Sequence, residues 1–83
     1  MEKRICDMNV GDAAEITHSF HVEEAMVRRL KELGFTENAS VCCVGESPLG
    51  GMKAYLIKGA VIALRNRDAV GISVNVGATE RQL

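Results

Sequence analysis

Side chains that could bind a transition metal gather in one short segment of the sequence. His18, His21 and Glu24 follow one another at intervals of three residues, and imidazole and carboxylate groups are common ligands of Zn²⁺ and Fe²⁺. His21 and Glu24 would share a helix face if the helix that follows already included His21. The segment therefore predicts a weak Fe²⁺ or Zn²⁺ site, and the competing interpretation is a polar helix N-terminus in water.

Three cysteines, Cys6, Cys42 and Cys43, could also act as metal ligands. Adjacent residues of a strand point to opposite faces, so Cys42 and Cys43 cannot easily share one ion, and we expect at least one of them to be a small buried hydrophobic residue. For Cys6 the sequence leaves core and exposed thiol both open. An odd cysteine count suits a reducing compartment. With no apolar signal segment in the first ten residues, it predicts a cytoplasmic protein.

The sequence contains no recognisable catalytic motif. No nucleophile motif surrounds the cysteines or histidines. Gly50-Gly51-Met52-Lys53 combines glycines with a lysine, as phosphate-binding loops do, but it leads into an expected strand and not a helix. We therefore interpret it as a hairpin turn and expect no enzyme.

A binding surface is the better hypothesis, because small barrels recognise partners through loops and exposed apolar residues. Leu49 and Met52 flank the glycine turn, and Arg28 and Lys31 would point outward from the expected helix. These four residues are the candidate partner contacts. The alternatives are packing at the end of the barrel for the apolar pair and a solvated helix face for the basic pair.

Charge and hydropathy argue against nucleic acid and membrane as partners, although a local basic patch stays open. Ten basic and eleven acidic residues leave a net charge of -1, whereas a nucleic-acid binder needs a basic excess. The longest aliphatic run, residues 60–64, is far shorter than the roughly 20 residues that cross a bilayer, so we expect no membrane insertion. A chain of 83 residues has a small core, and a homo-oligomer would bury further surface.

Two periodicities divide the remainder of the chain. Short or alternating apolar runs predict strands at residues 13–20, 39–46, 52–58, 60–65 and 72–76, with a short helical or turn connection at 66–70. Helical spacing predicts one helix over residues 22–33, ended by Gly34 in a left-handed cap with Phe35 folded back on the last turn. Its apolar stripe consists of Val22, Ala25, Met26, Leu30 and Leu33.

This order of elements predicts a mainly β fold. Short antiparallel strands with frequent glycines favour a small, partly open barrel, with the helix covering one side or one open end. We expect one domain over residues 1–77 and a flexible C-terminal tail at 78–83.

Four segments resemble, in order and spacing, those of a known family. They are Met8-Asn9-Val10-Gly11-Asp12, then Arg29-Leu30-Lys31-Glu32-Leu33-Gly34-Phe35, then Ser47-Pro48-Leu49-Gly50-Gly51, and finally Val61-Ile62-Ala63-Leu64-Arg65 followed by Asp68-Ala69 and Ile72-Ser73-Val74. The chain is thus similar to the FeoA family, small accessory proteins of bacterial ferrous-iron transport.

The resemblance implies an SH3-like β-barrel and a cytoplasmic role in ferrous-iron uptake, through protein–protein interaction with the membrane GTPase transporter FeoB. It brings no catalytic residues. The same domain also occurs in iron-dependent repressors, but we expect the stand-alone transport protein because this chain has no room for a DNA-binding domain. The alternative function is a metal-responsive regulator or iron-binding protein.

Overall fold

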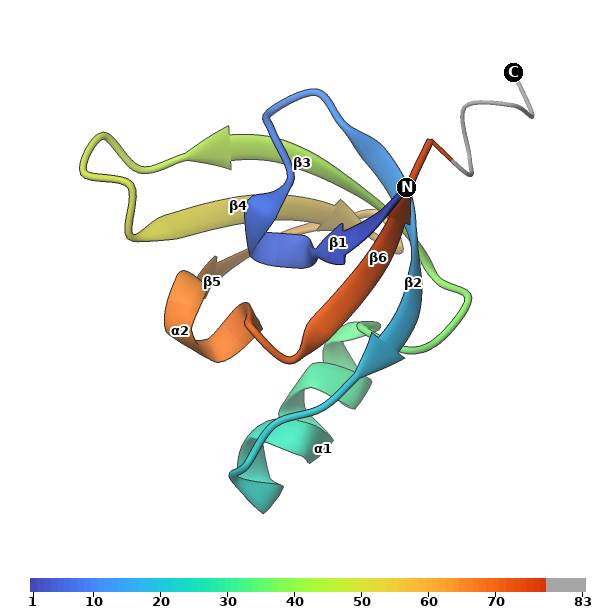
Figure 1. Cartoon of the computed structure of the whole chain (residues 1–83). Helices are drawn as coiled ribbons and strands as arrows, with labels where there is room; N and C mark the ends of the chain where they lie inside the picture. Colours follow the sequence, from blue (N-terminus) through green and yellow to red (C-terminus); the bar gives the residue numbers. More distant parts are fainter. Residues whose placement is uncertain (78–83) are drawn as a thin grey trace.

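An antiparallel sheet of six strands in the order β1-β6-β2-β3-β4-β5 dominates the computed structural model, which describes residues 1–77 (Figure 1). The tail expected at residues 78–83 lies outside the described residues. In chain order the elements are β1 (Glu2–Arg4), the 3₁₀ helix η1 (Ile5–Asp7), β2 (Ala13–Ser19), α1 (Glu24–Leu33), β3 (Ser40–Glu46), β4 (Met52–Ile57), β5 (Ala60–Arg65), α2 (Asn66–Ala69) and β6 (Ile72–Val76).

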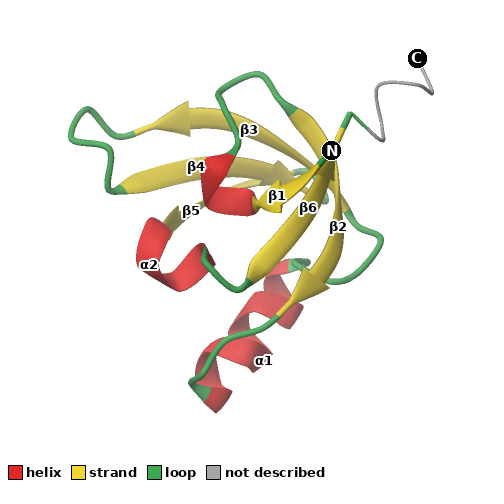
Figure 2. Cartoon of the chain, in the orientation of Figure 1, coloured by secondary structure: helices red, strands yellow, loops and turns green. Residues whose placement is uncertain are grey.

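The strands curl around η1, and α1 lies at one end of the sheet, beside the ends of β2 and β6 (Figure 2). α2 connects β5 to β6 on the side where η1 packs. The predicted mainly β class with one main helix is confirmed, as are the five predicted strands to within a residue or two at their ends. The helical connection predicted at residues 66–70 is α2.

Alternation along the strands separates the core from the surface. On β3, Val41 and Cys43 are buried while Val44 is exposed, and on β4, Tyr55 and Ile57 are buried. Ile16 of β2 points into the same core, as expected. With so few aromatic residues, the core depends on aliphatic side chains around one edge-to-face pair, Phe35 and Tyr55, whose ring centroids lie 6.1 Å apart.

The helix is shorter than predicted, and its apolar stripe is only partly correct. α1 begins at Glu24, so Val22 stands outside it with 86% of its surface exposed, and Ala25 is exposed as well. Only Leu30 is fully buried, because α1 packs on the core through its C-terminal half. The predicted end is confirmed: Gly34 has φ 103°, its N–H reaches the carbonyls of Leu30 and Lys31, and Phe35 is buried.

Strand β1 was not predicted, whereas the turn between β4 and β5 lies where the predicted strands at residues 52–58 and 60–65 meet. β1 pairs with β6, but its three residues are all charged and carry no strand pattern. β4 ends at Ile57 and pairs there with Ala60, so Lys58 and Gly59 form a two-residue turn. Their φ values of 49° and 81° are those of a type I′ turn, whose twist suits a hairpin.

Candidate partner-binding site

The turn between β3 and β4 exposes an apolar side chain at its tip and is closed by hydrogen bonds at its base. The Ser47 hydroxyl accepts hydrogen bonds from the N–H groups of Gly51 and Met52, at 3.1 and 3.2 Å. Ser47 N–H also donates to the Met52 carbonyl at 2.9 Å. Leu49 at the tip is 98% exposed, and Met52 is 38% exposed. Of the two sequence interpretations, the exposed apolar pair matches the structure better than packing at the barrel end.

Two arginines lie beside this turn. Arg65 of β5 pairs directly with Met52 of β4. Asn66, the first residue of α2, donates from its side-chain amide to the Gly50 carbonyl at 2.9 Å and from its backbone N–H to the Gly51 carbonyl at 3.0 Å. These bonds hold the start of α2 against the turn. An open hollow results, lined by Gly51, Met52, Arg65 and Arg67.

Sequence reasoning missed Arg65 and Arg67 as candidate contacts. They are more than a dozen positions from Met52 in the sequence, and only the antiparallel register of β4 and β5 brings Arg65 opposite it. A hairpin prediction with an assigned register could have found this pair, because directly opposed residues share a face.

The other two predicted contacts lie on a separate surface. Arg28 and Lys31 are exposed on α1, at the other end of the molecule from the β3–β4 turn (Figure 1). Lys31 borders a groove with Val27 and Phe35, among other residues, whereas Arg28 lies along a polar stretch of the helix. The four predicted contacts therefore form two patches and not one.

The predicted metal ligands do not converge. His18 Nδ1 lies 3.9 Å from a Glu37 carboxylate oxygen. His21 Nε2 lies 3.2 Å from Asp68 Oδ1, and His21 Nδ1 accepts a hydrogen bond from the Glu23 N–H at 2.9 Å. Since α1 starts only at Glu24, His21 is not on its face. Within residues 1–77, no three His, Cys, Asp or Glu side chains are grouped as a metal ion would need.

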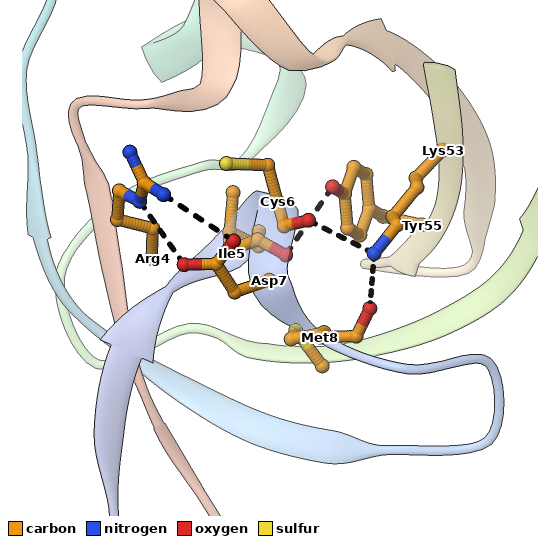
Figure 3. Close-up of polar contacts among 7 residues, drawn as sticks. All are labelled: Arg4, Ile5, Cys6, Asp7, Met8, Lys53 and Tyr55. Atoms are coloured by element: carbon orange, nitrogen blue, oxygen red, sulfur yellow. Dashed lines mark hydrogen bonds and ion pairs between the residues drawn. The ribbon is translucent and has the colours of Figure 1, made fainter. Parts of the chain in front are cut away.

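Side chains of two β4 residues, Lys53 and Tyr55, donate hydrogen bonds to backbone carbonyls of the N-terminal segment (Figure 3). The Lys53 ammonium donates to the carbonyl of Cys6 at 2.9 Å and to the carbonyl of Met8. The Tyr55 hydroxyl donates to the carbonyl of Ile5 at 3.3 Å. Lys53 is only 8% exposed, and no carboxylate of the described residues pairs with it. Its two hydrogen bonds tie the segment around η1 to β4.

Cys42 and Cys43 differ in burial, as the alternation of side chains along β3 requires: Cys42 is half-buried. Cys43 is buried, as expected for one of the pair, and Cys6 is buried as well, which settles the question that the sequence left open. Burial raises the pKa of the Cys43 thiol above its ordinary value. Burial likewise raises the pKa of Tyr55. Both groups are therefore neutral core residues at physiological pH.

The described helices fall short of the length and apolar content that a bilayer crossing requires.

Comparison with known proteins connects this fold to one family. The sequence model of the FeoA domain matches residues 3–76. The solution structure of the FeoA protein from Chlorobium tepidum is 32% identical to this chain, with a TM-score of 0.82 over 92% of this chain and 71% of that one. No curated protein matched the chain in a sequence search.

Two further structures agree with this relationship. Iron(II) transport protein A from Clostridium thermocellum is 27% identical, with a TM-score of 0.83 over 90% of this chain and 46% of that one. FeoA from Stenotrophomonas maltophilia, solved in complex with zinc, is 26% identical, with a TM-score of 0.74 over 88% and 89%. The latter is described as a prokaryotic SH3 domain protein and a candidate activating factor of ferrous-iron transport.

The predicted SH3-like fold and the resemblance inferred from sequence are thus both confirmed. Since the domain model covers nearly every described residue, the chain belongs to the FeoA family, non-enzymatic accessory proteins implicated in ferrous-iron transport.

Proposed function

We propose that this protein supports ferrous-iron uptake in the cytoplasm by binding the cytoplasmic part of the membrane transporter FeoB. The observation that carries the proposal is the β3–β4 turn: Leu49 is 98% exposed on a base fixed by the Ser47 hydroxyl. The backbone of this turn is already ordered by these hydrogen bonds. A partner that covers Leu49 therefore orders less of the chain than it would on a flexible loop, which lowers the entropy cost of binding.

The neighbouring charges add selectivity. Arg65 and Arg67 border the same hollow as Met52, so an apolar side chain of the partner could lie on Leu49 and Met52 while a carboxylate meets a guanidinium. Arg28 and Lys31 on α1 form the second predicted contact surface, and the two surfaces can be tested separately.

The decisive experiment is a pull-down of the full chain on the cognate FeoB in nanodiscs, with and without guanine nucleotide. Leu49→Glu should abolish or strongly weaken binding if the turn is the contact, and Arg28→Glu should do so if α1 is. Val10→Glu, which changes an exposed valine in another turn, is the matched control. No association of the unmodified protein in either nucleotide state would refute the proposal.

A metal-responsive role is the second candidate function, favoured by the zinc complex of the Stenotrophomonas relative. In this chain, His18, His21 and Glu24 would have to rearrange to share an ion, because His21 is engaged by Asp68 and the Glu23 N–H. Anaerobic calorimetry with Fe²⁺ and with Zn²⁺ tests it. Binding that survives in the His18→Ala, His21→Ala double variant would rule out this site.

A further inference from the structure

The two edges of the sheet differ in their protection. Exposed edge strands invite pairing with other chains, and natural proteins blunt them with short length, charge or proline. β1 has three residues, all charged. β5 has six residues, of which only the last, Arg65, is charged, and it contains no proline.

The free side of β5 is available for hydrogen bonding. β5 pairs with β4 alone, and its backbone makes no hydrogen bond to any other segment among residues 1–77. In an antiparallel ladder, alternate N–H and C=O groups of an edge strand point outward. These groups form a template for an added strand.

The outer face beside this edge is apolar. Val61 of β5 is 63% exposed, and Leu56, directly opposite on β4, is 40% exposed. Cys42 of β3 lies opposite Leu56, so one row of apolar side chains crosses three strands. Ala63 and Ala54 form the next pair along β5. A strand added to β5 would place every second side chain on this face of the sheet, beside Val61 and Ala63, where apolar residues would be favoured.

The charged residues from Lys58 to Arg67, which include β5, are all basic. Lys58 precedes the strand, Arg65 ends it and Arg67 follows, and all three are exposed. No acidic residue occurs between Glu46 and Asp68. None of the three cations is ion-paired with a carboxylate of the described residues. Asp68, which directly follows Arg67, lies 3.2 Å from His21 Nε2.

This charge pattern decides between a second copy and a different partner. Antiparallel pairing of β5 with β5 of another copy would bring Lys58 near Arg65 and Arg67 of that copy at both ends. Parallel pairing would align like charges as well, and like charges across an interface oppose association. A segment with acidic residues at its ends meets both cationic ends of β5 favourably.

We propose that β5 binds an extended segment of a partner protein by strand addition, the segment having apolar residues at alternate positions and acidic residues at its ends. The proposal rests on the proposed function only for the identity of the partner, which would be FeoB. It assigns a second contact next to the Leu49 turn, since Arg65 borders both.

The test uses a short synthetic peptide of alternating valine and threonine between terminal glutamates, titrated into the isotope-labelled full chain. We expect shift changes confined to β5 and its neighbours and slower amide exchange at alternate β5 residues. The same peptide with terminal lysines should bind at least about tenfold more weakly, since attraction at each end becomes repulsion.

Variants localise the contact. Val61→Lys should weaken peptide binding about tenfold or more by placing a charge on the apolar row, while Val10→Lys, a similarly exposed valine elsewhere, should bind as the unmodified protein does. Arg65→Glu should lose the preference for acidic ends, and Arg29→Glu on α1 should keep it.

The outcomes separate the two proposals. If the acidic peptide does not bind, if Val61→Lys and Val10→Lys bind it equally, or if β5 amides are protected by self-association alone, strand addition to β5 is refuted. If the peptide binds at β5 but FeoB does not bind the protein, strand addition stands and the proposed function fails.

Discussion

Replacing Lys53 with methionine removes the charged donor that holds the N-terminal segment to β4. The alkyl stem of methionine keeps most of the packing, so the change isolates the hydrogen bonds to the carbonyls of Cys6 and Met8. A buried carbonyl left without a donor costs about 1–3 kcal/mol. Two such groups give about 2–6 kcal/mol of lost stability.

Part of this loss is offset, because the variant no longer buries an ammonium group that only neutral carbonyls solvate. We therefore expect a net loss of about 2–3 kcal/mol in the free energy of unfolding. For a domain of this size, that corresponds to a fall in Tm of about 8–24 °C.

Urea unfolding followed by circular dichroism measures the effect, with Lys31→Met, on the exposed surface of α1, as the control. Amide exchange should also accelerate at residues 5–8 and remain slow in β3. A loss below about 1 kcal/mol, or an equal loss in the control, would show that Lys53 does not anchor η1 in solution.

Three further predictions concern pH and glycines. First, the free energy of unfolding should fall above pH 9. Burial raises the pKa of Cys43 above its ordinary value of 9.0 and that of Tyr55 above 10.0, so at alkaline pH the unfolded chain releases protons that the folded protein retains. The free energy of unfolding then decreases by up to about 1.4 kcal/mol per pH unit for each group. Below pH 9 the stabilisation from both protonated groups is fully present. Urea unfolding at a series of pH values should show a shallower alkaline decrease in the free energy of unfolding for Cys43→Ala than for the unmodified protein. An unchanged slope would contradict this. Second, Gly34→Ala should cost about 1–2 kcal/mol, because φ is 103° there and the Lys58 side chain would lie 3.0 Å from the new Cβ; thermal unfolding measures it. Third, Gly71→Ala should cost about 1–3 kcal/mol by forcing backbone apart, since its Cβ would lie 2.1 Å from the Phe20 carbonyl oxygen. Gly51→Ala, with nothing within 4 Å, is its control, and equal stability of the two variants would show that the β2–β6 end adjusts freely.

The sequence by itself determined the elements whose signals are local. The end of α1 at Gly34 follows from a left-handed cap that a glycine adopts without steric cost. The burial of Val41 and Cys43 and the exposure of Val44 follow from the period of a strand. The FeoA relationship could likewise be recognised from motifs read in order, because each of them forms a turn, a helix end or a short strand within a few residues.

Only the tertiary structure decided the contacts between segments distant in the chain. η1 and β1 carry no pattern of their own, and they are held by Lys53, Tyr55 and β6. The start of α1 was misjudged because Val22 suits the helical stripe, although no part of the core reaches it.

The site divides in the same way. The sequence determined that Leu49 and Met52 flank a turn, because proline and glycine settle the local backbone. Strand register places Arg65 and Arg67 beside the same hollow as Met52. Strand order makes β5 an edge strand without a second neighbour among the described residues. These are long-range properties, since they depend on which segments pair and not on the residues within one segment.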